Sequence, residues 1–170
     1  MNDRGEYIEF GGRPAVRFER TYPHPVERLW RAITEPDELT RWFPSHVVMD
    51  LRPGGTAEFS GDPNAEPTTG KVLVAEPPHR LVYTWGGDEL HFELTSTTDG
   101  TTLVFVDVLE ARDTAARTAT GWTVCLAAFE SALAGEPVDG PHSDGAMPWR
   151  PVYDAYLAAG MPSGAAVPED

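Results

Sequence analysis

Hydrophobic and polar positions alternate along much of the chain before residue 114, a pattern typical of half-buried strands. Between residues 13 and 22, Val16 and Phe18 fall on one side and Arg17 and Glu19 on the other, which predicts a first strand. Six more strands, separated by Gly, Pro or Asp-Gly turns, are predicted over 47–51, 56–60, 70–75, 81–85, 90–95 and 101–109. Because the connections are short, these seven strands should be mostly antiparallel.

The period becomes helical between residues 114 and 134, and Gly135 follows as a C-cap. The apolar stripe of this long helix comprises Trp122, Leu126, Phe129 and Leu133. Two short helices are predicted after the first strand, over 25–34 and 37–43. A sheet with one apolar face needs a cover, and the long helix is the one predicted element large enough. We therefore expect an α+β fold, a curved seven-stranded antiparallel sheet wrapped around one long C-terminal helix, which is the helix-grip architecture.

The two ends of the chain differ in composition from its middle. Residues 1–12 are polar and glycine-bearing and are expected to form a loose lead-in, which leaves 13–135 as the folded domain. Residues 136–170 are expected to form a linker and tail with a short docking helix over about 149–159. The predicted docking face of that helix is Trp149, Tyr153 and Tyr156 or Leu157.

Acidic residues dominate the charge, with 27 Asp and Glu against 13 Lys and Arg, a formal net charge of -14 at pH 7. Such a surface repels phosphate backbones and anionic lipid heads, so we expect neither nucleic acid nor a membrane as partner. The single cysteine, Cys125, excludes a disulfide within the chain. The chain starts without an apolar run of the signal-peptide type and lacks the roughly 18 consecutive apolar residues of a membrane span. We therefore expect a cytoplasmic protein.

Motifs of known chemistry are missing from the sequence. It contains no Gly-x-Ser-x-Gly elbow, phosphate loop, dinucleotide fingerprint, Cys-x-x-Cys or His-x-x-x-His pair. The five histidines are scattered, and His46 alone would suit the mouth of a pocket. We therefore predict no metal site, no cofactor and no catalytic residue.

Four stretches of the sequence resemble a known family. They read, in order, VERLWRAITEPDELTRWF, DLRPGG, GKVLVAEPPHRLVYTW and GWTVCLAAFESALAG. Together they resemble the activator-of-heat-shock-protein-90-ATPase homologues, a family of the START-like or SRPBCC superfamily. The resemblance implies a helix-grip fold with a pocket between sheet and long helix, and it leaves a homodimer open because such chains often form dimers. It carries over no catalytic set. The eukaryotic co-chaperone has an additional N-terminal domain that residues 1–12 could not supply, so chaperone activation is not expected.

Asp107 is the most informative polar residue. It shares one face of its strand with Leu103 and Phe105, while Val104 and Val106 occupy the other, so alternation alone does not say which face is internal. The family resemblance implies that the Asp107 face points toward the helix. A carboxylate there needs a partner or a proton. Three interpretations stay open, namely a rim position paired with Arg112 or water, a polar anchor in an apolar pocket, and a general base.

Aromatic residues from several strands and the long helix converge on the same side of the predicted sheet. Such rings either fill a core or wall a pocket, and a strongly curved sheet leaves space that one helix rarely fills. Gly121, inside the long helix, costs about 1 kcal/mol in helix propensity relative to alanine, and its missing side chain would allow close backbone approach or leave room for a ligand. The predicted ligand-binding residues are Phe59, Tyr83, Trp85, Phe92, Phe105, Asp107, Gly121 and Trp122.

Three functions fit these observations. The first is a protein that binds a small hydrophobic or aromatic molecule between sheet and helix. The second is a cyclase- or hydrolase-like enzyme that uses Asp107 with Tyr83 as acid and base, and the third is a protein-interaction module of the co-chaperone type. We favour the first over the second because no convergent acid/base pair is visible, and only slightly over the third. An exposed apolar patch in place of a cavity would reverse that order.

Overall fold

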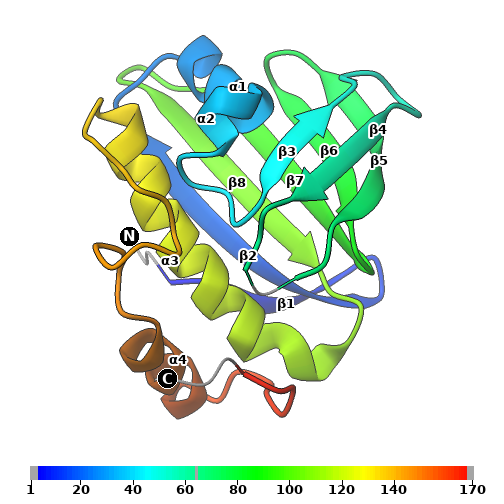
Figure 1. Ribbon diagram of the computed structural model, residues 1–170, viewed down its shortest axis with the longest axis vertical. Helices are drawn as coiled ribbons and strands as arrows, with labels where there is room; N and C mark the ends of the chain where they lie inside the picture. Colours follow the sequence, from blue (N-terminus) through cyan, green and yellow to red (C-terminus); the bar gives the residue numbers. More distant parts are fainter. Residues whose placement is uncertain (1–3, 64, 168–170) are drawn as a thin grey trace.

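An antiparallel sheet of eight strands forms one layer of the protein in a computed structural model that describes residues 4–63 and 65–167 (Figure 1). Its order across the sheet is β1-β2-β8-β7-β6-β5-β4-β3. The strands are β1 (Glu6–Phe10), β2 (Arg13–Tyr22), β3 (His46–Met49), β4 (Thr56–Ser60), β5 (Thr68–Glu76), β6 (Arg80–Trp85), β7 (Asp88–Ser96) and β8 (Thr101–Val108). Neighbouring strands in this order pair antiparallel, as predicted.

The prediction of seven strands is wrong by one, because β1 lies within the segment expected to be a loose lead-in. Glu6 pairs with Arg17 and Phe10 with Arg13 across a two-residue turn. That turn is Gly11-Gly12, with φ of 57° and 81°, values that match the right-handed twist of a hairpin and suit glycine. The strand is an edge strand with only partial burial, so its hydrophobic alternation is weak.

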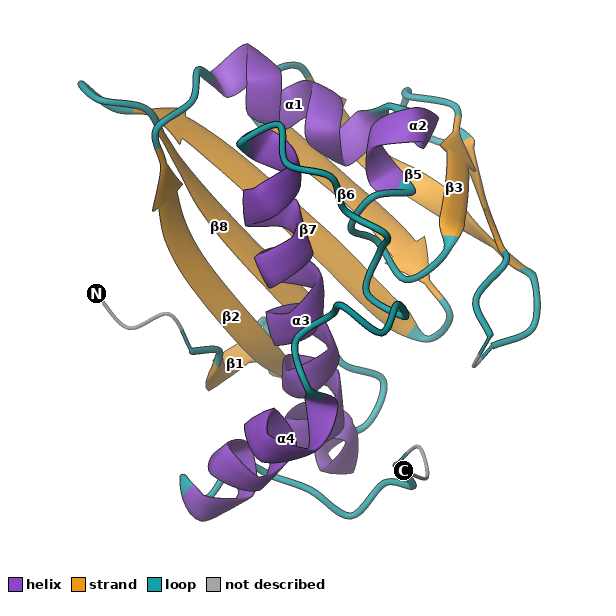
Figure 2. Cartoon of the chain, turned by 60° about the vertical axis from the view of Figure 1, so that its left-hand side comes forward, coloured by secondary structure: helices purple, strands orange, loops and turns teal. Residues whose placement is uncertain are grey.

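One long helix lies across one face of the sheet, and the sheet curves around it (Figure 2). All four residues of the predicted stripe, including Trp122 and Phe129, are buried, so that prediction is confirmed. The predicted second short helix is shorter than expected, since it ends at Leu39 and turns follow it. The helices are α1 (Val26–Thr34), α2 (Pro36–Leu39), the 3-10 turn η1 (Arg112–Thr114), α3 (Ala115–Leu133) and α4 (Trp149–Ala158). The arrangement is α+β and consistent with the helix-grip fold.

The two faces of β8 account for its continuous apolar sequence. Leu103, Phe105 and Asp107 lie on the inner face, toward α3, with exposures of 0–2%, and the two apolar residues belong to the main core. Val106 and Val108 form a small second cluster on the outer face with Ala15. The inward orientation of Asp107 is therefore the one that the family resemblance implied.

The C-terminal segment, which includes α4, packs against α3 (Figure 2). The Tyr156 hydroxyl lies 2.7 Å from Thr123 Oγ1 on α3 and accepts the Gly5 N–H at 2.9 Å. Beyond α4 the chain returns to α3, where the Ala116 N–H donates to the Pro162 carbonyl at 2.9 Å. Tyr153 and Tyr156 are buried and Leu157 is exposed, so Tyr156 rather than Leu157 completes the docking face. No helix in the described part of the chain is both long enough and apolar enough to cross a membrane.

Candidate functional site

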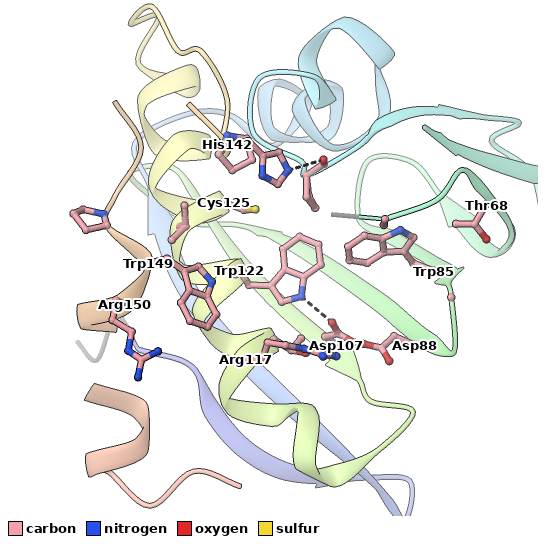
Figure 3. A pocket seen from close by; sticks show the side chains of 18 of the residues that line it. Thr68, Trp85, Asp88, Asp107, Arg117, Trp122, Cys125, His142, Trp149 and Arg150 are labelled. Atoms are coloured by element: carbon pink, nitrogen blue, oxygen red, sulfur yellow. Dashed lines mark hydrogen bonds between the residues drawn. The ribbon is translucent and has the colours of Figure 1, made fainter. Parts of the chain in front are cut away.

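A cleft of about 840 Å3 opens between α3, the β6–β7 turn, the end of β8 and the segment before α4 (Figure 3). Trp85 and Asp88 come from the two sides of the turn, Asp107 from β8, and Gly121 and Trp122 from α3. The segment 141–151 supplies the opposite wall, which includes His142, Trp149 and Arg150. The cleft is therefore bounded by parts of the chain that are distant in sequence.

Four of the eight residues predicted to bind a ligand line this cleft. They are Trp85, Asp107, Gly121 and Trp122. Gly121 faces open space, since a Cβ built on it would meet no atom within 4 Å apart from its own helix backbone and chain neighbours. A side chain at this position would therefore enter the cleft.

The other four predicted residues do not line the cleft, contrary to expectation, because their rings pack against one another in the core. Phe59 stacks on Tyr83 with ring centroids 6.0 Å apart, and Tyr83 stacks on Phe92 at 5.8 Å. Phe92 meets Phe105 at 4.8 Å, and all four side chains are at most 2% exposed. The four rings lie on the predicted face of the sheet, but they fill the core and do not line the cleft.

Asp107 lies at the floor of the cleft with no solvent-exposed surface. Its Oδ2 accepts a hydrogen bond from Trp122 Nε1 at 2.7 Å (Figure 3), whereas no described N–H or hydroxyl donates to its buried Oδ1. The expected alternative of a rim position paired with Arg112 is wrong, since Asp107 is buried and the Arg112 guanidinium lies over the Tyr7 ring at 5.4 Å. One of the two carboxyl oxygens of Asp107 is therefore available to accept a further hydrogen bond.

Asp88 lies beside Asp107 (Figure 3) and was not among the site residues predicted from the sequence. Leu90 pairs with Asp107, and Asp88, two residues earlier, shares the same face of β7 because side chains alternate along a strand. Its Oδ1 accepts the Glu110 N–H at 2.9 Å. A Gly-Gly-Asp sequence is typical of a turn, so its side chain could have been placed only from the strand register.

The neighbouring Asp88 affects the ionisation of Asp107. Burial raises the pKa of Asp107 well above its usual range, and so do the charge and the close approach of the Asp88 carboxyl. The hydrogen bond from Trp122 and the charge of Arg13 oppose this rise. The raised pKa means that Asp107 takes up a proton more readily than an exposed aspartate does.

Tyr83 lacks the features of a partner in acid/base chemistry. Burial and the charge of Asp107 raise the pKa of its hydroxyl. The hydroxyl is buried without a hydrogen-bond partner among the described residues, and Tyr83 does not line the cleft. Tyr83 would thus remain protonated and out of reach of a molecule in the cleft.

Residues near His142 form a second polar group at the rim. His142 Nε2 lies 3.0 Å from the Pro44 carbonyl and 3.6 Å from Asp62 Oδ1. Cys125 lines the cleft nearby, and burial together with the charge of Asp62 raises the pKa of its thiol, which disfavours a thiolate nucleophile.

His46, the histidine singled out from the sequence, lies outside the cleft and contacts Thr40. Among the described residues, no three His, Cys, Asp or Glu side chains gather as metal ligands would.

The family described as Activator of Hsp90 ATPase homolog 1-like protein matches residues 23–134, well over half of the chain. The protein belongs to this family. No curated protein matches the chain.

Solved structures with the same fold accompany this family assignment. Protein EF2215 from Enterococcus faecalis, whose function is unknown, is 21% identical with a TM-score of 0.72 over 91% of this chain and 89% of that one. CalU16 from Micromonospora echinospora is 23% identical with a TM-score of 0.69 over 94% and 99%. The protein encoded by gene BPP1335 from Bordetella parapertussis is 25% identical, with a TM-score of 0.66 over 92% and 89%. These similarities extend the fold assignment and bring no function with them.

The region that matches the Hsp90 ATPase activator homologue family supplies only part of the cleft. Trp85, Asp88, Asp107 and Trp122 lie inside residues 23–134, whereas the opposite wall at 141–151 lies beyond them. The linker before α4 was expected from its Gly, Pro and polar residues to be a simple connection. Trp149 was expected only to dock the last helix, so its place in the wall was not predicted.

Proposed function

We propose that this member of the Hsp90 ATPase activator homologue family binds a small hydrophobic or aromatic molecule in the cleft between sheet, α3 and the segment before α4. One observation carries the proposal, namely a hollow of about 840 Å3 that is walled by indole rings and floored by a buried carboxyl with an open oxygen. Small-molecule sites are typically clefts of roughly 300–1,000 Å3 with apolar walls and few polar groups.

The aromatic walls suit a flat apolar molecule. Trp85 and Trp122 meet edge to face with ring centroids 5.6 Å apart, and Trp149 stands on the other side of the cleft (Figure 3). Tryptophan offers a large contact area with few rotatable bonds, so little entropy is lost when a ligand fixes it. Selectivity then rests on the few polar groups, of which the Asp88–Asp107 pair lies deepest.

The competing functions have less support in the described residues. An enzyme of the predicted kind needs an acid and a base at the ligand, and Tyr83 is outside the cleft. An interaction module should expose a contiguous apolar patch. Among the described residues, the exposed large apolar side chains are distributed over β1, β3 and the residues after it, β5, and α4 and the segment before it, namely Phe10, Val48, Leu51, Leu73, Met147 and Leu157.

Gly121 offers a direct test of the proposed site. Gly121→Leu should fill the cleft from the α3 side, because its side chain would enter space that is now open. The matched control is Gly121→Ala, which changes the backbone in the same way, leaves most of the volume free and raises helix propensity by up to about 1 kcal/mol. Urea unfolding would verify that both variants fold.

Native mass spectrometry of the three proteins, purified from the organism that encodes them, supplies the measurement. We expect wild type and Gly121→Ala to retain a small molecule and Gly121→Leu to lose it. Equal retention by Gly121→Leu would place the bound molecule elsewhere. If nothing is retained and no aromatic compound binds to the purified wild type, the interaction-module function takes the place of this one.

A further inference from the structure

The geometry points to a ligand with a protonated amine on an aromatic or other apolar body, with the amine seated against Asp88 and Asp107 and the body between the tryptophans. This inference rests on the proposed function and narrows it to one chemical class. Three independent features of the cleft support it: the open carboxylate oxygen, the aromatic walls and the distribution of charge around the pair.

The carboxyl pair requires a hydrogen-bond donor. Trp122 satisfies Oδ2 of Asp107, but Oδ1 is buried without a protein N–H or hydroxyl donor among the described residues. Buried polar atoms normally have such a partner, and an unpaired one costs stability. Asp107 has no exposed surface whereas Asp88 is partly exposed, so a ligand would touch Asp88 first with Asp107 directly behind it. An ammonium carries up to three donors and a positive charge, and it can serve both carboxylates at once.

The walls of the cleft favour a cation for a separate reason. The faces of tryptophan rings carry negative electrostatic potential and attract ammonium groups, most strongly when water is excluded. Trp85, Trp122 and Trp149 all line the cleft that the Asp pair closes at its floor. The chain as a whole carries a formal charge of -14, which raises the local concentration of cations.

Positive groups near the cleft already have partners of their own. Arg13 on β2 donates to the carbonyls of Leu109 at 3.2 Å and Gly87 at 3.4 Å. Arg117 on α3 donates to the Ala166 carbonyl at 2.9 Å, and Arg150 on α4 pairs with Asp154 at 3.3 Å. The charge of Arg13 favours ionisation of Asp107, but among the described residues no ion pair joins an arginine to Asp88 or Asp107, so an ammonium could take that place.

Binding of an amine should depend on pH, because Asp107 is fully buried beside Asp88 and its pKa is raised. The titratable groups around the pair are Arg13 on β2, Tyr83 on β6, Glu110 after β8 and Arg117 on α3, and of these Arg13 favours ionisation of Asp107. An ammonium would stabilise the carboxylate form of Asp107, so a proton carried by Asp107 would be released to solvent on binding. Affinity for an amine should therefore rise with pH until the amine itself loses its charge.

The test is a panel of aromatic bodies of one to three rings, each prepared with an ammonium, an alcohol and a carboxylate head; the naphthalene set is 1-naphthylmethylamine, 1-naphthylmethanol and 1-naphthoate. Isothermal titration calorimetry on wild type should show the ammonium member binding roughly tenfold or more tightly than the alcohol, as expected for a charge-assisted hydrogen bond. The carboxylate should bind weakest. Repeating the ammonium titration in buffers of different ionisation enthalpy should reveal proton release.

Asp88→Asn tests the assigned group. The asparagine amide can donate to Asp107, so it removes the accessible carboxylate and satisfies the open oxygen together. The ratio between ammonium and alcohol should then fall close to unity. The control is Glu89→Gln, which removes the same charge from the adjacent residue, whose carboxylate instead binds His91 at 2.7 Å, and it should keep the wild-type ratio.

Each outcome decides a different claim. Tighter binding of the alcohol or carboxylate, or an ammonium preference that survives Asp88→Asn, overturns the amine inference and leaves the proposed small-molecule function standing. An ammonium preference that disappears equally in Glu89→Gln attributes the selectivity to general charge and also overturns it. Failure of every panel member to bind wild type at millimolar concentration overturns the inference and the proposed function together.

Discussion

The hydrogen bond between Trp122 and Asp107 joins α3 to β8 in the middle of the core. A buried carboxylate is costly, and the hydrogen bond from the indole N–H of Trp122 offsets part of that cost, whereas the charge of Asp88 adds to it. An asparagine at position 107 would satisfy the same contacts without a charge. The carboxyl therefore adds an acidic group to the cleft at some expense of stability, a pattern typical of binding sites.

Asp107→Asn should stabilise the protein relative to wild type by an amount that grows with pH. The folded state raises the pKa of Asp107, so the carboxyl contributes most below about pH 4, where folded and unfolded chains are both protonated. As the pH rises toward the folded-state pKa, the unfolded chain gives up its proton first and that contribution is lost, by at most about 1.4 kcal/mol per pH unit. Urea unfolding of both proteins between pH 5.5 and 8 measures the difference.

Asp88→Asn serves as the control for this dependence. It removes the like charge that helps raise the pKa of Asp107, so its stability should fall less steeply with pH than that of wild type. A difference between Asp107→Asn and wild type that stays constant from pH 5.5 to 8 would show that Asp107 is ionised throughout.

Residue-level prediction from the sequence succeeded where one strand or helix decides the outcome. Alternation placed Phe105 and Asp107 on one face, and the family resemblance pointed that face inward. Prediction from the sequence failed where a contact depends on how two separate elements pack together. Asp88 reaches Asp107 only through the β7–β8 register, and His142 reaches the cleft only because the linker folds back over α3. Contacts of this kind depend on packing between segments that no local pattern records.

At the scale of elements, α3 is buried on two sides. Its predicted stripe packs on the sheet, and Thr123 on another side contacts α4 through Tyr156. The helix is therefore apolar around more of its circumference than a single stripe, with Val124 and Cys125 buried as well. The sequence predicted this helix within about a residue at each end, since its period is long and unambiguous, while β1 was missed because a half-exposed edge strand carries little pattern.

Phe129→Ala should test the contact of α3 with the end of β2 and with the turn that follows α2. The Phe129 ring has no exposed surface and lies 5.3 Å from the Tyr22 ring and 5.0 Å from the Trp42 ring, centroid to centroid. Its removal leaves a cavity at this junction, so the free energy of unfolding should fall by roughly 3–5 kcal/mol. Urea denaturation measures the loss, and Phe129→Leu, which keeps most of the volume, should lose clearly less. A loss below about 1 kcal/mol for Phe129→Ala would mean that the junction collapses to fill the space.

The whole molecule combines the family fold with a cleft wall that lies outside the matched family region. The matched family region ends at residue 134, and the chain from 141 to 151 completes the cleft. The ligand-facing surface can therefore change through this segment while sheet and α3 keep their packing. Over the same molecule, negative charge exceeds positive charge by 14. Repulsion between like charges on such a surface destabilises the folded state, so the stability should depend on the salt concentration.

Sodium chloride should stabilise this protein at pH 7. With 27 acidic and 13 basic residues, repulsion between like charges outweighs the attraction of surface ion pairs such as Arg17–Glu19. Raising the ionic strength from about 0.01 M to 0.15 M shortens the screening length from roughly 30 Å to 8 Å, which weakens the longer-range repulsion more than the contacts. For a chain of this size, each 1 kcal/mol gained should raise Tm by roughly 2–4 °C in calorimetry. The increase should shrink as the pH approaches the isoelectric point of about 4.6, where repulsion vanishes. An equal increase at both pH values would assign the effect to ion binding at a specific site instead of screening.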